Sequence, residues 1–213
     1  MAVKTLKPTT PGRRGMTSQD FSKVTTKKPL KSLLVVKRRT NGRNNQGRIT
    51  VRHRGGGAKR FYRLVNFKQL DFAKATIEAI EYDPNRSANI ARIKDEAGKY
   101  HYILASGSMK VDQVITVGEK AAIEEGNRLA LKDIPTGSFI YAIEMQPGRG
   151  AQMVRSAGVK AQLTAKEGEY AQVKLPSGEV RMVNMNCMAS LGNVGNEQHQ
   201  NVKIGSAGRR RNQ

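Results

Sequence analysis

The sequence predicts an all-β protein, made of two small barrels in tandem with an extended basic N-terminal arm and a basic C-terminal tail. From residue 61 onward, short β-branched runs recur at intervals of roughly ten residues, separated by Gly and Pro turn signals. The segment between the two basic ends suits two small barrels better than one large sheet. The chain has no heptads and no internal repeat, so neither a coiled coil nor a solenoid is expected.

Positive charge is concentrated at the two ends of the chain. The 213 residues have a net charge of +21, yet residues 1–60 hold 17 Lys/Arg and one acid, and residues 203–213 hold four Lys/Arg and no acid. Residues 61–202 are nearly neutral, with 17 Lys/Arg and 16 Asp/Glu. A folded core cannot neutralise such ends, so the pattern predicts a body anchored in a polyanion by its extensions.

The expected elements of the N-terminal part follow in chain order. Residues 1–30 contain three prolines and no sustained period, which predicts an extended arm that is disordered before its partner binds. The apolar run 31–36 is expected to dock on the body, and the cluster Lys37-Arg38-Arg39 follows it. Short strands are expected to begin near Ile49 and Phe61.

The body is expected to consist of short strands joined by tight turns. Strands are predicted over 75–82, 89–93, 100–105, 114–117, 137–146, 161–165, 170–175 and 179–183. Segments 94–99, 166–168 and 176–178 are expected to be hairpin turns, and 121–128 either a turn or a single helical turn. The two barrels are expected to divide near residues 125–130.

Several function classes find little support in the sequence. The single cysteine, Cys187, allows no intrachain disulfide, which suits a reducing compartment, and its flanking methionines predict a small buried hydrophobe. No apolar run approaches the roughly 18 residues of a membrane span, and the N-terminus lacks the apolar centre of a secretion signal, so a cytosolic protein is expected. His53, His101 and His199 have no metal-ligand spacing. We therefore predict no catalytic residue, metal, cofactor or small-molecule substrate.

The segment 42–63, GRNNQGRITVRHRGGGAKRFYR, combines seven Lys/Arg and five glycines with no acid. Glycines let the backbone approach phosphates, and the Asn and Gln side chains add hydrogen-bond donors. A nucleic-acid-binding segment is favoured over a solvated, disordered basic loop.

Two polar loops between predicted strands are further candidates. The first, 82–89, contains the turn signal Asp-Pro-Asn followed by Arg86 and Ser87, and it is either a phosphate or base contact or an ordinary hairpin loop. The second, 146–158, carries Arg149 and Arg155 among three glycines and lacks the Gly-Lys-Ser/Thr end of a P-loop. RNA contact is preferred for this loop, with a structural barrel loop as the alternative.

RNA is the favoured polyanion because the motifs are loops and arms. The sequence has no zinc-finger spacing and no helix suited to the major groove, and its 11 aromatic residues are too few for a broad stacking platform. Two alternatives stay open: an enzyme acting on RNA, and a generic cationic binder of membranes or acidic proteins. The predicted RNA contacts are Arg13, Arg14, Arg43, Asn44, Asn45, Arg48, Arg52, His53, Arg54, Lys59, Arg60, Arg63, Asn85, Arg86, Ser87, Arg149, Arg155, Arg209, Arg210 and Arg211.

The chain closely resembles the bacterial-type second protein of the large ribosomal subunit from end to end. The matching motifs are KPTTPGRRGMTSQDFS (7–22), KSLLVVKRRTNGRNNQGRITVRHRGGGAKRFYR (31–63), EYDPNRSANIARI (81–93), QPGRGAQMVRSAG (146–158), LPSGEVRM (175–182) and VGNEQHQNVKIGSAGRRR (194–211). The resemblance implies 23S-type rRNA, neighbouring ribosomal proteins and the small subunit as partners, with Arg86 and Arg155 contacting rRNA. It also implies a primary rRNA-binding role in assembly, subunit joining and support of the peptidyl-transferase region.

The resemblance also implies a domain plan. It predicts an rRNA-binding arm over 1–60, an OB-type barrel over 61–127, an SH3-like barrel over 128–198 and a basic tail over 199–213. In the family the chain continues into a long basic extension with a His-Pro-His-Gly-Gly-Gly run. Relative to the family the tail is truncated here, and two explanations stay open: the sequence is cut short, or this member lacks the extension. No residue of this sequence, His199 included, is expected to take over the role of that histidine.

Overall fold

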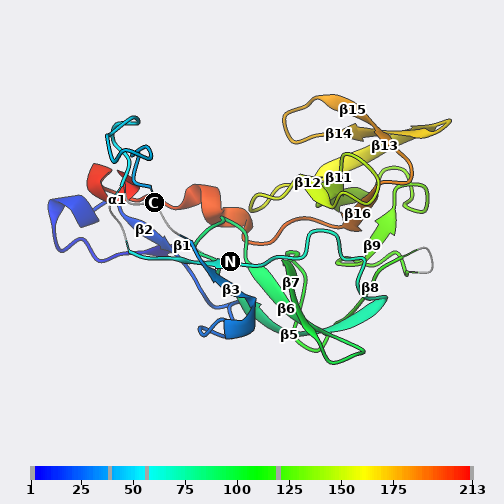
Figure 1. Ribbon diagram of the computed structural model, residues 1–213, viewed down its shortest axis with the longest axis horizontal. Helices are drawn as coiled ribbons and strands as arrows, with labels where there is room; N and C mark the ends of the chain where they lie inside the picture. Colours follow the sequence, from blue (N-terminus) through cyan, green and yellow to red (C-terminus); the bar gives the residue numbers. More distant parts are fainter. Residues whose placement is uncertain (1–2, 38–39, 56–57, 119–120, 212–213) are drawn as a thin grey trace.

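A computed structural model describes residues 3–37, 40–55, 58–118 and 121–211. Two larger antiparallel sheets, one of four strands and one of six, follow each other along the chain (Figure 1). Helical structure in the described residues is limited to η1 (Pro11–Arg13), η2 (Lys31–Leu33), η3 (Glu197–Asn201) and α1 (Ala207–Arg211). The predicted all-β class is confirmed. The expected features at Arg38, Arg39, Gly56 and Gly57 lie outside the described residues.

The four-stranded sheet forms from the hairpins predicted for the first half of the body. It comprises β5 (Lys74–Glu81), β6 (Ile90–Asp95), β7 (Tyr100–Leu104) and β8 (Val114–Thr116), in the order β7-β6-β5-β8. Buried Ala75 and Ile77 alternate with exposed residues along β5, as expected for a strand with one face on a core. The β6–β7 turn places Gly98 at φ 81°, where glycine is favoured.

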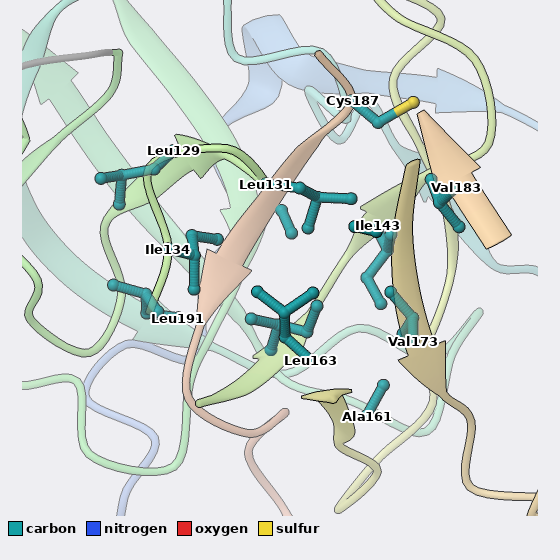
Figure 2. Close-up of a cluster of buried hydrophobic side chains, with 13 residues drawn as sticks. Leu129, Leu131, Ile134, Ile143, Ala161, Leu163, Val173, Val183, Cys187 and Leu191 are labelled. Carbon is teal, nitrogen blue, oxygen red and sulfur yellow. The ribbon is translucent and has the colours of Figure 1, made fainter. Parts of the chain in front are cut away.

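The six-stranded sheet contains the predicted three-strand meander. It comprises β9 (Arg128–Ala130), β10 (Phe139–Tyr141), β13 (Ala161–Glu167), β14 (Tyr170–Lys174), β15 (Val180–Asn184) and β16 (Met188–Leu191), in the order β15-β14-β13-β10-β16-β9. Figure 2 shows its core, a buried cluster to which Leu131, Leu163, Val173 and the fully buried Cys187 belong. Cys187 has no solvent exposure, which confirms the small buried hydrophobe predicted there. This burial raises the pKa of its thiol to about 11.

The prediction of one continuous strand over 137–146 is wrong. Ala142 adopts φ 50° and separates β10 from β11 (Ile143–Glu144), which pairs with β12 (Ala151–Met153) in a separate two-stranded sheet. The buried side chain of Arg128 donates to the Ala142 carbonyl at 2.8 Å, so tertiary contacts hold this turn. Segment 121–128 contains a turn at 125–126 and ends at Arg128, where β9 begins. Neither β9 nor β16 was predicted, because both are short and lack clear alternation.

The N-terminal arm lies along the body and contains strands that its local sequence did not predict. β1 (Val3–Thr5) pairs with β2 (Thr17–Gln19), and the tail is tied to this hairpin because Thr17 N donates to the Lys203 carbonyl at 2.9 Å. Figure 1 shows the hairpin beside α1. The predicted docking of 31–36 is confirmed, since β3 (Leu34–Val36) pairs with β4 (Phe61–Arg63).

Candidate nucleic-acid interface

The two candidate loops meet at the junction of the two large sheets. Ser87 of the first loop accepts a hydrogen bond from Ala157 N of the second at 3.1 Å, and its carbonyl accepts one from Asn196 Nδ2 at 2.7 Å. A buried apolar cluster lies beneath them and is formed by Ala88, Leu104, Tyr141, Ala142, Ala151 and Val194. The loops are therefore fixed to each other as well as to their own strands.

Asp83 organises the first loop from a fully buried position. Its Oδ1 accepts a hydrogen bond from Asn85 N at 2.8 Å, and its Oδ2 pairs with Arg86 Nε at 2.5 Å. The Asn85 side chain donates to the Phe61 carbonyl at 2.7 Å, and Arg60 donates to the Pro84 carbonyl at 2.9 Å. The Asp-Pro-Asn sequence thus forms a rigid turn that presents Arg86. Hydrogen bonds join this turn to the end of the Gly/Arg segment.

Glu144 organises the second loop in the same way. Its fully buried carboxylate accepts hydrogen bonds from Gly148 N and Gly150 N at 3.1 Å and from Met188 N at 3.2 Å, and it pairs with Arg128 Nη2 at 3.1 Å. Burial lowers the pKa of Arg128, and the adjacent Glu144 carboxylate opposes this shift. The second loop is therefore held on a buried ion pair, which sequence reasoning did not single out.

Phe67 brings the two predicted arginines together. The guanidinium carbon of Arg86 lies 5.5 Å from the centroid of the Phe67 ring, and that of Arg155 lies 4.9 Å from it. A guanidinium held over an aromatic ring keeps N–H donors free at its edge, where they can bind phosphate in bidentate fashion. Phe67 was missed because nothing in its local sequence distinguishes it.

The Gly/Arg segment is an ordered loop in its described part. Asn44 Oδ1 accepts hydrogen bonds from Gln46 N and Arg48 N, both at 3.0 Å, and the Gly42 carbonyl accepts from Thr50 N at 2.8 Å. The side-chain oxygen of Asn44 therefore accepts hydrogen bonds within the loop, and a role of Asn44 in RNA contact stays a prediction. The exposed predicted residues of this loop are Arg43, Asn44, Asn45, Arg48, Arg52, His53, Arg54 and Lys59.

The remaining predicted residues differ in how available they are. Arg63 is only 8% exposed and donates to the Phe61 carbonyl at 2.9 Å, so it stabilises the β3–β4 ribbon in this structure. Arg149 is exposed and donates to Gln146 Oε1 at 2.7 Å. Four exposed arginines lie in the arm and tail, namely Arg13, Arg14, Arg209 and Arg210, whereas the side chain of Arg211 lies outside the described part.

The enzyme hypothesis gains no site from this geometry. His53 lies in the exposed Gly/Arg loop, His101 is buried on β7 and pairs with Asp95 at 3.2 Å, and His199 lies in η3. Within the described ranges, no group of three or more His, Cys, Asp or Glu side chains is arranged to hold a metal ion. Over the same ranges, no helix is long and apolar enough to cross a membrane.

The fold and the site together define a class: an all-β RNA-binding protein that presents arginines from loops, an arm and a tail. Two family models match the chain, one for the RNA-binding N-terminal domain of Ribosomal Proteins L2 over residues 30–117 and one for the C-terminal domain of Ribosomal Proteins L2 over residues 124–213. The chain belongs to the ribosomal protein L2 family. It is a structural, RNA-binding component of the large ribosomal subunit and not an enzyme.

Proposed function

We propose that the protein is a primary binder of 23S-type rRNA that supports large-subunit assembly, association of the two subunits and the peptidyl-transferase region, in ribosomes of the cytoplasm. The observation that carries this proposal is the convergence of Arg86 and Arg155 on one ring, Phe67, at the junction of the two sheets. Two guanidinium groups held this close together can bind two phosphates that a folded RNA holds in a fixed arrangement. A polyanion without a fixed fold offers no such matched pair of phosphates.

The mechanism is electrostatic and geometric. The arm, the Gly/Arg segment and the tail replace counterions along rRNA, which supplies much of the affinity and makes it salt-dependent. The loops at the junction fix the orientation of the body. The domain plan stays part of the proposal: an arm over 1–60, an OB-type barrel over 61–127, an SH3-like barrel over 128–198 and a tail over 199–213.

Neighbouring ribosomal proteins and the small subunit are the further partners we propose. The edge strand β15 supports a protein partner, because Val180 and Met182 are exposed on it. Exposed apolar side chains on an unpaired edge favour contact with another chain.

Arg155→Ala tests the proposed rRNA contact. Arg155 is exposed, and its one described polar contact is a 3.3 Å hydrogen bond to the Ala151 carbonyl, so its removal leaves no buried charge behind. We expect weaker binding to large-subunit rRNA and a salt slope smaller by about one. The matched control is Arg181→Ala, which removes an exposed arginine of β15 that is paired with Glu179. Equal losses in the two variants would refute a specific role of Arg155.

Arg86 requires a milder substitution. Arg86→Ala would leave the buried Asp83 carboxylate without its ion-pair partner, and the loop would be destabilised together with any RNA contact. Arg86→Lys keeps a positive charge beside Asp83 and removes the planar fork. We expect this variant to melt within a few degrees of the wild type and to bind rRNA more weakly, as shown by thermal unfolding and filter binding.

A further inference from the structure

We propose that a cavity between the N-terminal hairpin, the first loop and the C-terminal tail binds a single unpaired nucleotide of RNA. This inference rests on the proposed function and adds a ligand class and a subsite to it. The cavity has a volume of about 470 Å³, which lies in the range of about 300–1,000 Å³ usual for small-molecule sites. It is lined by Thr17, Ser18, Gln19, Phe21, Tyr82, Arg86, Ser87, His199, Val202, Ile204 and Arg209.

Two aromatic side chains supply a stacking surface. The rings of Phe21 and Tyr82 meet edge to face, with centroids 5.4 Å apart and an interplanar angle of 87°. Phe21 is 50% exposed and Tyr82 is 43% exposed, so this pair leaves ring surface open. Unstacked RNA bases bind to such exposed rings by stacking.

The polar lining is rich in donors and contains no carboxylate. Arg86 comes from the first loop and is paired with Asp83, whereas Arg209 comes from α1, donates to Met16 Sδ and has no acidic partner within the described residues. Gln19 Nε2 is buried and has no hydrogen-bond partner among the described atoms. Phosphate oxygens and base carbonyls are hydrogen-bond acceptors. A nucleotide would therefore neutralise the charge of Arg209 and accept a hydrogen bond from the unpaired Nε2 of Gln19.

The position of the cavity favours an RNA nucleotide over a free metabolite. Arg86 lines the cavity and also approaches Phe67, so the cavity lies next to the proposed rRNA contact at the junction. Its walls come from the arm and the tail, which are held together by the bond from Lys203 N to Thr17 Oγ1 at 2.7 Å. A nucleotide that enters here would lie between the two basic extensions, where the phosphate backbone is expected.

Tyr82→Leu, assayed by binding of the full chain to large-subunit rRNA across a salt series, tests the proposal. We expect about tenfold weaker binding with an unchanged salt slope, because a stacking contact releases no counterions. The matched control is Tyr170→Leu, which removes a tyrosine of similar exposure, 45%, from β14 in the other sheet. Tyr82→Phe keeps the ring and should bind like the wild type.

Phe21→Leu repeats the test from the arm, so the proposal stays falsifiable if Tyr82→Leu does not fold. Wild-type affinity in either folded leucine variant, with Arg155→Ala still weakened, would overturn the nucleotide site and leave the proposed function standing. Equal losses in Tyr82→Leu and Tyr170→Leu would also overturn it. Failure of the wild type to prefer large-subunit rRNA would instead overturn the proposed function together with this site.

Discussion

Glu144→Gln is expected to destabilise the protein by about 3–5 kcal/mol, the usual range for breaking a buried ion pair by removing one partner. The two carboxylate oxygens of Glu144 accept four hydrogen bonds, from Arg128, Gly148, Gly150 and Met188. Glutamine keeps the shape of the side chain but replaces one carboxylate oxygen with an NH₂ group. Each oxygen of Glu144 accepts from two N–H groups, so the NH₂ donor would face two other donors. It also leaves the fully buried guanidinium of Arg128 without a counter-charge.

A loss of this size is a large share of the roughly 5–15 kcal/mol by which domains are stable, so urea unfolding will resolve it. The control is Glu179→Gln, which removes a carboxylate from an ion pair on the surface and should change the free energy of unfolding by no more than about 0.5 kcal/mol. Because Glu144 holds the second loop, the folded fraction of Glu144→Gln should also bind rRNA more weakly. A loss below about 1 kcal/mol, or equal losses in the two variants, would refute the account of Glu144 as the anchor of this loop.

Three further predictions concern backbone, pH and the thiol. Gly158→Ala should lower the free energy of unfolding more than Gly168→Ala does, as measured by chemical unfolding. Both glycines have positive φ, which costs about 1–2 kcal/mol for alanine. A Cβ at 158 would in addition lie 2.8 Å from Glu197 Cα, whereas a Cβ at 168 would meet nothing within 4 Å. Equal losses would contradict the close approach. Burial raises the pKa of Glu81 above 4.5, so its protonated form favours folding, and the stability of the wild type relative to Glu81→Gln should fall as pH rises above about 4.5. A difference independent of pH would contradict this. Cys187, with its pKa raised to about 11, should react with a thiol reagent at pH 8 only on unfolding, and rapid labelling of the native protein would contradict its burial.

The parts of the fold that sequence could predict are those set by local signals. The turns around Gly98, Gly168 and Gly178 follow from positive φ between β-branched runs, and all three form as expected. The break at Ala142 could not be predicted, because the buried Arg128 side chain and the β11–β12 pairing impose it. The arm was predicted as extended, but its hairpin is held by hydrogen bonds to the C-terminal end of the chain. The pattern of residues within the arm carries no information about these distant partners.

In the candidate site, too, the residues marked by local signals could be predicted, whereas the contacts made by packing could not. Arg86 and Arg155 could be singled out because charge, glycine and turn signals mark their loops, and the resemblance to the family pointed to both. Their common partner Phe67 could not be found from spacing, because the contact exists only once the two sheets pack together. Asp83 and Glu144 hold the loops from buried positions. Asp83 belongs to the Asp-Pro-Asn turn signal that the sequence shows, whereas Glu144 is marked in the sequence by no such signal.

Binding to large-subunit rRNA, with small-subunit rRNA and duplex DNA as competitors across a salt series, tests the central claim most directly. We predict a preference for the large-subunit RNA that persists as salt is raised and that is reduced by Arg155→Ala but not by Arg181→Ala. Equal binding to all three nucleic acids, lost steeply with salt in every variant, would contradict specific docking by the junction and leave only the charge of the extensions.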